Sequence, residues 1–308
     1  MAHRLALVTL AATSVLIVLG GVVTNTGAAL AVPDWPSTFG YNMFLFPWTQ
    51  MVGGIFYEHS HRLAGAAVGL LTLALAAALW HRGGRLRWLG IAAVAVVVLQ
   101  GVLGGLRVTL LAATLAIVHG SLAPAFFALL AAIALLTSRA AGGSLRGPEP
   151  AVRRLAVAAV AAVYVQIVFG ALLTHAGRLW LHVGGALVVF VVVPIVGARL
   201  RKSGDPVAAP VARALLVLLG LQLLLGVGSF LVRFTTIWIP GEQATTLVLL
   251  VAHRLAGSLI LGAAVVLALR APIASGEDVQ AMRIGRTEPA ASWAGHPRSA
   301  AGSRTPLQ

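Results

Sequence analysis

The chain has 308 residues and the composition of a membrane protein rather than of a soluble globule. Hydrophobic residues make up 59% of it and charged residues only 10%, whereas a soluble domain is about a quarter charged. It contains no cysteine, which excludes disulfides, thiolate nucleophiles, iron–sulfur clusters and Cys-ligated zinc. The formal net charge is +14, but the placement of the basic residues fits membrane orientation better than a DNA-binding face, so we expect no nucleic-acid partner.

Eight apolar runs are long enough to cross a bilayer as helices, which takes about 20 residues each. They are residues 5–27, 54–80, 86–108, 111–137, 153–175, 179–199, 210–233 and 244–270. The first run could also be a secretory signal peptide, because small residues follow it, but its length favours a retained first span. The sequence therefore predicts an all-α polytopic membrane protein with eight transmembrane helices.

The basic residues predict the orientation of these spans. Most of them, including the cluster Arg82, Arg85 and Arg87, fall on one side of the membrane if the N-terminus is cytoplasmic. This bias is the positive-inside rule. We therefore expect a multi-pass protein of the cell (inner, cytoplasmic) membrane, surrounded by the lipid bilayer, with both termini in the cytoplasm.

Four spans lie on each side of a polar segment near the middle of the chain. We predict two pseudo-repeated four-helix bundles, residues 1–138 and 153–270, joined by a cytoplasmic linker at 139–152. Residues 271–308 lose the apolar pattern and are rich in Ala, Ser, Gly, Pro and Arg, a composition that predicts a disordered cytoplasmic tail.

A local repeat supports the internal similarity. Spans three, five and seven each carry a glutamine followed four residues later by a glycine: Gln100 and Gly104, Gln166 and Gly170, Gln222 and Gly226. Residues four apart share a helix face, where glycine allows close contact and the amide can hydrogen-bond to a neighbouring helix. Plain helix packing is a sufficient explanation of this pattern.

Each even-numbered span carries a candidate ligand histidine near its outer end: His61, His119, His182 and His253. An ionisable side chain within a bilayer is costly and indicates a functional site by default. Two pairs of neutral imidazoles, with no cysteine and almost no carboxylate nearby, suit axial ligation of two haem irons better than a zinc or di-iron site. Nearby glycines would let a flat macrocycle lie against the backbone: Gly65, Gly120, Gly184, Gly185 and Gly257.

The other histidines are weaker candidates. His3, His81 and His296 fall in inner boundary or tail positions, where we expect them to be solvated. His59 and His175 lie at the outer side, close enough to the predicted sites to support them.

The segment Glu58-His59-Ser60-His61-Arg62 opens the second span and follows an outer loop that contains Pro33-Asp34-Trp35-Pro36. Together with the eight spans and the four histidines, it resembles the haem A synthase family of cytochrome oxidase assembly proteins, over about residues 15–270. The resemblance implies that haem O binds in the N-terminal bundle as substrate, and that its C8 methyl group is oxidised to a formyl for cytochrome oxidase maturation. It also implies a haem b cofactor in the C-terminal bundle, which would deliver electrons.

Carried over by residue, the resemblance places His61 and His119 around the substrate haem and His182 and His253 on haem b. It makes Glu58 the candidate catalytic acid. Glu58 lies three residues before His61, so the two share a helix face, and a carboxyl beside a haem edge could move protons. The alternative is that Glu58 orients Arg62 or stabilises the N-terminus of the helix.

Five arginines depart from the charge bias and lie at the outer side: Arg62, Arg107, Arg178, Arg233 and Arg254. Guanidinium binds carboxylate in bidentate fashion, so these residues are candidates to pair with haem propionates; snorkelling to the interface is the alternative. The sequence HRLAG occurs at 61–65 and again at 253–257, which predicts that Arg62 binds the substrate haem and Arg254 the haem b cofactor.

Two other functions stay open, a di-haem b membrane cytochrome that transfers electrons and a haem chaperone. One histidine per helix, all at one depth, argues against electron transfer across the membrane, and the sequence lacks the midplane charges in broken helices that favour a transporter. Haem O synthase and cytochrome oxidase assembly proteins are the protein partners that we consider, and a homo-oligomer is a further option. Many family members carry a cysteine pair in an outer loop, and its absence here excludes electron entry through thiols.

Overall fold

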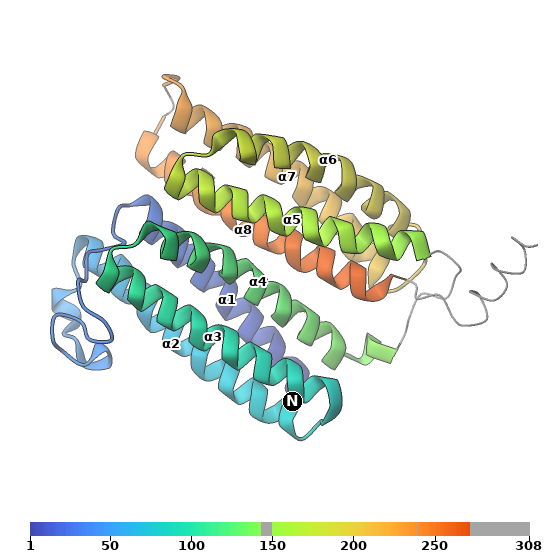
Figure 1. The fold of residues 1–308 in the computed structure, drawn as a ribbon, viewed down its shortest axis with the longest axis horizontal. Helices are drawn as coiled ribbons and strands as arrows, with labels where there is room; N and C mark the ends of the chain where they lie inside the picture. Colours follow the sequence, from blue (N-terminus) through green and yellow to red (C-terminus); the bar gives the residue numbers. More distant parts are fainter. Residues whose placement is uncertain (143–149, 239, 272–308) are drawn as a thin grey trace, which may run out of the picture.

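The computed structural model describes residues 1–142, 150–238 and 240–271 (Figure 1). Within these ranges, eight helices are long and apolar enough to cross a membrane, and no strand is formed. Their bounds agree with the predicted spans to within three residues, which confirms an all-α polytopic membrane protein. The helices are α1 (Ala2–Asn25), α2 (Gly53–Trp80), α3 (Gly84–Leu110), α4 (Ala113–Thr137), α5 (Pro150–Ala176), α6 (Leu179–Leu200), α7 (Ala208–Phe234) and α8 (Glu242–Arg270).

The helices form two rings of four in chain order. In the first ring α1 and α3 each contact α2 and α4, and in the second α5 and α7 each contact α6 and α8. The two rings meet where α4 packs on α8 and α5, and where α1 packs on α8 (Figure 1). Helices α2 and α4 are therefore diagonal partners in the first ring, as are α6 and α8 in the second.

The packed apolar cores occupy only one half of each ring. We call the end of the molecule that carries Met1 and Ala271 the inner end, and the opposite end the outer end. The buried core of the first ring comes from the inner halves of its helices, with Leu75, Leu79, Leu130 and Ile133 as its largest members. The core of the second ring likewise uses the inner halves of α5 to α8. The outer halves hold the polar residues described below.

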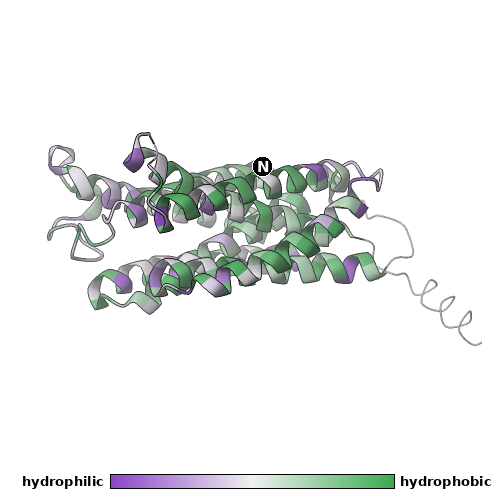
Figure 2. Cartoon of the chain, turned by 90° about the horizontal axis from the view of Figure 1, so that it is seen from above, coloured by the Kyte–Doolittle hydropathy of each residue, from purple (hydrophilic) through white to green (hydrophobic). Residues whose placement is uncertain are grey.

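The surface has the character of a membrane protein. Hydrophobic residues cover most of the length of the helices, and hydrophilic residues gather toward their ends (Figure 2). Exposed tryptophans lie at both ends, Trp80 and Trp88 at the inner end and Trp48, Trp180 and Trp238 at the outer end. Because tryptophan favours the membrane–water interface, these two sets mark the two boundaries of the bilayer.

A buried ion pair joins three segments at the inner end. Arg270, the last residue of α8, pairs with Asp205 in the connection between α6 and α7. The same guanidinium donates a hydrogen bond to the main-chain oxygen of Ala140, just after α4, at 2.7 Å. Both side chains of the pair are about 5% exposed, so the contact lies inside the protein.

The inner end also contains His3 and the ends of the predicted linker and tail. His3 was expected to be solvated, but it is half-buried and its Nδ1 lies 2.9 Å from the main-chain oxygen of Ala134, because α1 begins at Ala2 and packs on α4. The prediction for His3 is therefore wrong. Residues 272–308 of the predicted tail, which include His296, and residues 143–149 of the predicted linker lie outside the described residues.

Candidate functional site

The four predicted ligands lie on diagonal helices and meet in pairs. The rings of His182 on α6 and His253 on α8 have centroids 6.1 Å apart and planes at 70°. Two imidazoles that bind opposite sides of one metal ion at about 2 Å each would have centroids roughly 6 Å apart. His61 on α2 and His119 on α4 are close enough to interact electrostatically. The spacing of His182 and His253 suits one metal ion between them.

A glycine on a neighbouring helix faces each of these rings. We call Gly20, Gly104, Gly170 and Gly226 the seat glycines. A Cβ atom built on them would lie 3.1, 3.3, 3.3 and 3.2 Å from Cε1 of His61, His119, His182 and His253, respectively. These distances are shorter than ordinary van der Waals contacts, so each imidazole occupies space that any other residue would fill.

Three of the four seat glycines lie four residues after a predicted glutamine. Each of these glutamines contacts the neighbouring helix, at the histidine that the seat glycine faces. Gln100 Nε2 donates to the main-chain oxygen of His119 at 3.2 Å, and Gln166 Nε2 donates to that of His182 at 2.9 Å. Gln222 Nε2 lies 3.2 Å from Nε2 of His253. The expected bridge between helices is confirmed for these three residues. The sequence analysis missed Gly20, because the residue four before it is Leu16 and not glutamine.

The hydrogen bonds of His119 fix its tautomer. Its Nδ1 lies 3.2 Å from the main-chain oxygen of Gln100, and because a carbonyl only accepts, Nδ1 carries the proton. The lone pair on Nε2 then stays available to a metal. In the second bundle the amide of Gln222 donates a hydrogen bond to Nε2 of His253. This is the ring nitrogen that an iron would use.

Unpaired buried polar atoms also gather at these sites. Among the described residues, His61 Nδ1, His253 Nδ1 and the Oε1 atoms of Gln100, Gln166 and Gln222 are buried without a hydrogen-bond partner, and so is Ser229 Oγ in the outer half of α7. Unpaired buried polar atoms are rare in folded proteins, and each needs an explanation. Their concentration around the paired histidines is the expected signature of sites built to hold another group.

These observations allow a test of whether the residues fit a haem. The donors are imidazoles in pairs, the two large buried apolar clusters lie mainly in the inner halves, and a Cβ at Gly65, Gly120 or Gly184 would meet no atom within 4 Å. No group of three or more His, Cys, Asp or Glu that could hold a metal occurs in the part of the chain that the structure describes. The paired imidazoles and the open space beside these three glycines are compatible with a flat macrocycle. Two of the predicted glycines are exceptions: Gly185 is covered by Gln166 and Phe169, and a Cβ at Gly257 would lie 3.6 Å from Nε2 of Gln222.

Glu58 is buried and engaged with its surroundings. Its Oε1 accepts a hydrogen bond from Arg62 at 2.8 Å, and its Oε2 accepts one from the main-chain nitrogen of Val32 at 2.9 Å. Arg62 also donates to the main-chain oxygens of Val32, Asp34 and Ser37 at 2.9, 2.7 and 3.1 Å. The pair thus holds the outer loop in place, which is the arrangement that the alternative role of Glu58 requires.

The outer loop covers the outer end of the first bundle. The ring of Trp35 lies on Gly105 of α3, so closely that a Cβ at Gly105 would be 2.2 Å from Cδ2 of the indole. His59 is buried under the same loop, with Nδ1 3.1 Å from the hydroxyl of Thr38. Burial alone would raise the pKa of Asp34, but hydrogen bonds from Gly40, Ser37 and Phe39 hold it below its usual value.

The outer arginines differ in what surrounds them. Arg254 is half-buried near Arg107 and Arg233, and His175 lies within electrostatic range of all three. Among the described residues, neither Arg254 nor Arg107 forms an ion pair. Arg62 follows His61, and Glu58 lies three residues before that histidine. Arg254 follows His253 in the same way, but the residue three before that histidine is Leu250. Arg254 and Arg107 are thus available to bind an anion, whereas Arg62 is occupied by Glu58 and the loop.

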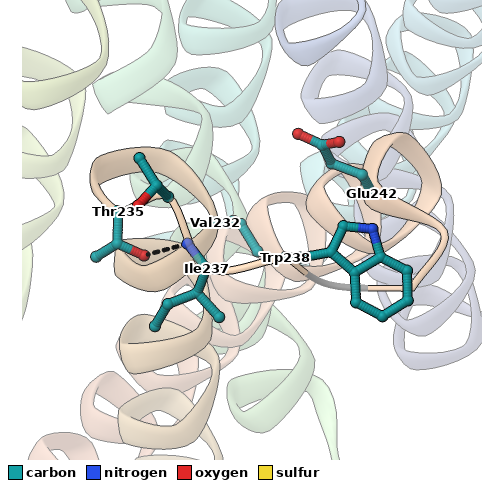
Figure 3. Close-up of a pocket in the computed structure, with 6 residues that line it drawn as sticks. Val232, Thr235, Ile237, Trp238 and Glu242 are labelled. Atoms are coloured by element: carbon teal, nitrogen blue, oxygen red, sulfur yellow. Dashed lines mark hydrogen bonds between the residues drawn. The ribbon is translucent and has the colours of Figure 1, made fainter.

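A hollow at the turn between α7 and α8 is separate from these sites (Figure 3). It is lined by Val232, Thr235, Thr236, Ile237, Trp238 and Glu242. The hydroxyl of Thr235 accepts a hydrogen bond from the main-chain nitrogen of Ile237 at 3.4 Å. None of its lining residues is a predicted ligand.

Fold and site together define a class, the polytopic membrane proteins with paired imidazoles inside two helical bundles. The model of the cytochrome oxidase assembly protein family matches residues 3–182, more than half of the chain, so the chain belongs to that family. Heme A synthase of Shouchella clausii (strain KSM-K16) is 32% identical over 105 residues. That match covers 33% of this chain and 34% of the relative, about a third of each.

Proposed function

We propose that this protein is a haem A synthase. The N-terminal bundle, residues 1–138, binds haem O as substrate, and the C-terminal bundle, residues 153–270, binds haem b as cofactor. The observation that carries the proposal is the pair of imidazoles in the outer half of each bundle, each ring against a seat glycine. Family membership and the name of the relative, Heme A synthase, support the reaction.

The reaction would convert the C8 methyl group of haem O into a formyl group, in which one oxygen replaces two hydrogens; the four electrons removed from this carbon must pass to an external oxidant. When bound, haem b supplies one-electron transfer. His61 and His119 would hold the substrate haem, and His182 and His253 would hold the cofactor haem. Because these ligands come from the membrane-spanning helices, the substrate stays away from bulk water.

Arginines at the outer side would bind the haem propionates. Arg254 suits this role for haem b, because it is half-buried beside other cations and forms no ion pair within the described residues. Arg107 suits it for the substrate haem, since it lies within electrostatic range of His61 and His119. Arg62 would contribute indirectly, by positioning the loop above the substrate.

Glu58 would move a proton during methyl oxidation. Its position supports this role. Glu58 lies on α2 three residues before His61, it is buried, and it is close enough to Arg107 to interact with its charge. Each carboxylate oxygen already accepts one hydrogen bond and keeps a second lone pair that could take up a proton.

The protein would act in the cytoplasmic membrane with both termini in the cytoplasm. Haem O synthase is the natural upstream partner, because it makes the substrate. The charge bias of the sequence supports this orientation, since the arginine-rich connections lie at the inner end.

The test is acid–acetone extraction of haem from a strain that carries a haem O synthase, with and without this protein, followed by mass identification. We expect haem A, or its hydroxylated precursor, only when the protein is present. A His61→Ala variant should abolish the product and keep the haem of the second bundle. A His253→Ala variant should lose that second haem.

Haem b bound to the protein with haem O unchanged would overturn the synthase proposal. Haem that stays bound through purification would then favour an electron-transfer cytochrome. Haem that is released readily to an acceptor protein would favour a chaperone.

A further inference from the structure

A long uncharged segment belongs to the loop that connects α1 to α2 at the outer end. Residues 35–57 contain no Asp, Glu, Lys, Arg or His. In a soluble protein about a quarter of the residues are charged, and they gather on the surface that meets water. The composition of this segment therefore resembles that of a surface in contact with lipid more than that of a loop in water.

An aromatic cluster fastens this segment to the first bundle. The ring of Phe46 is buried, and its centroid lies 5.1 Å from that of His59 on α2. The rings of Phe39 and Tyr41 lie 5.9 and 5.8 Å from that of Phe46. The short 3₁₀-helix Met43–Leu45 also contacts α2. The segment is thus held along the side of α2 and does not extend away from the bundle.

These contacts place the segment at the depth of the helix ends. His59 lies six residues after the start of α2, about 9 Å along the helix. Gly105, which the ring of Trp35 covers, lies about 8 Å before the end of α3. A segment embedded in the surface of a bilayer lies about 5–10 Å deep, at the boundary between headgroups and acyl chains. The loop therefore lies beside the outermost turns of the spans, where this boundary is expected.

Large apolar side chains of the segment are nevertheless left exposed. Phe44, Leu45 and Trp48 are 65, 75 and 81% exposed. Phe56, which is 50% exposed, extends the same apolar character onto the first turn of α2, a helix that lipid surrounds. An aromatic-rich surface at this depth favours the membrane–water interface. The exposed face of the loop is therefore continuous with the face that the bilayer covers.

We propose that residues 39–52 form an interfacial anchor, a segment that lies in the surface of the bilayer at the outer end and places Phe44, Leu45 and Trp48 among the lipids. The partner is the lipid itself, because the segment is uncharged, lies at the depth of the helix ends and adjoins the lipid-facing surface of α2. The anchor would restrict the movement of the loop over the first bundle, since Trp35 belongs to the same loop. It does not depend on the presence of haem.

The test uses the absence of cysteine from the chain, since a single introduced cysteine then carries the only thiol label. Full-length Leu45→Cys protein is labelled with the environment-sensitive dye nitrobenzoxadiazole and placed in nanodiscs that hold one copy of the protein in phosphatidylcholine and phosphatidylglycerol. Lipids that carry a nitroxide either near the headgroup end or near the methyl end of the acyl chain then quench the dye. We expect several-fold stronger quenching by the shallow nitroxide.

Two further positions calibrate the depth. Lys202→Cys, at an exposed residue next to Arg201 at the inner end, should be quenched weakly by both lipids. Leu70→Cys, at a residue that is 66% exposed well inside α2, should be quenched strongly by the deep nitroxide. If Leu45→Cys does not fold, Phe44→Cys takes its place and should give the same result.

Quenching of the label at residue 45 as weak as that of Lys202→Cys overturns the anchor. Emission at the wavelength of the dye in water would then show a surface open to a soluble partner. Blue-shifted emission without quenching would show that protein, rather than lipid, covers the segment. Either result leaves the proposed function intact, because extraction of haem A tests that function separately.

Discussion

Each predicted ligand lies against a seat glycine of a neighbouring helix, and it can lie there because glycine has no side chain. Because the seat glycines have no Cβ, the imidazoles lie against backbone and reach the interior of the bundle in one defined orientation. Bonds between imidazole and a metal are about 2 Å long and directional, so a displacement of a few tenths of an ångström matters.

Gly226→Ala tests this dependence. The new Cβ would lie 3.2 Å from Cε1 of His253 and displace its ring, so we expect the purified protein to retain several-fold less haem in the second bundle. Alanine favours a helix over glycine by roughly 1 kcal/mol, so lost helix stability would not explain the result. The measurement is haem content by pyridine haemochrome. Gly220→Ala is the control on the same helix, where a Cβ meets nothing within 4 Å and retention should be normal.

A pair of substitutions at Glu58 separates its two possible roles. Glu58→Gln keeps an oxygen that can accept a hydrogen bond from Arg62 but removes the ionisable carboxyl, whereas Glu58→Ala removes both. If Glu58 moves a proton, extraction of haem A should show at least a tenfold loss with either substitution. Normal haem A from Glu58→Gln, with loss only in Glu58→Ala, would assign Glu58 to holding the loop.

At the scale of elements, the outer loop depends on its contact with α3. Gly105→Ala would place a Cβ 2.2 Å from the indole of Trp35 and lift the loop off the helix. We expect faster hydrogen–deuterium exchange at residues 32–40, measured by mass spectrometry, because the main-chain hydrogen bonds to Asp34 and Glu58 would loosen. Gly101→Ala, on the same helix where a Cβ meets nothing within 4 Å, should leave exchange unchanged.

The elements themselves were predictable, and their contacts were not. Lipid requires about 20 apolar residues in each span, so hydropathy alone located all eight helices. Which residues meet depends on how neighbouring helices are rotated and shifted, and no single span encodes that. The contact of Gly20 with His61, of Trp35 with Gly105 and of Arg270 with Asp205 therefore emerged only from the structure. The three glutamine bridges could be anticipated because the same spacing occurs three times.

At the scale of the whole molecule, the inner end is stabilised by the pair of Asp205 and Arg270. Removing one partner of a buried pair costs roughly 3–5 kcal/mol, because the other charge stays buried. Asp205→Asn should therefore lower the unfolding temperature in detergent by several degrees, measured by thermal denaturation. An unchanged unfolding temperature would show that the pair adds nothing to stability.

The same pair predicts a dependence on pH. Burial alone would raise the pKa of Asp205, but hydrogen bonds from Arg270 and from the main chain of Ala208 and Val207 hold it below its ordinary value. A carboxyl with a lowered pKa stabilises the folded state at pH above its unfolded value of about 4, and this contribution is lost as the pH falls through the folded value. Wild-type stability should therefore decrease on acidification more steeply than that of Asp205→Asn, in thermal scans between about pH 3 and pH 7.

The bond from Arg270 to Ala140 has a mechanical consequence. This hydrogen bond joins the segment after α4 in the first bundle to the end of α8 in the second, at the inner end. A rotation of one bundle against the other would therefore have its pivot at the inner end. Displacement grows with distance from a pivot, and α8 with its 29 residues is about 40 Å long. Gly21 of α1 also lies against Val251 of α8 in the outer half, so such a rotation would leave the inner cores intact and act first on this contact between the bundles.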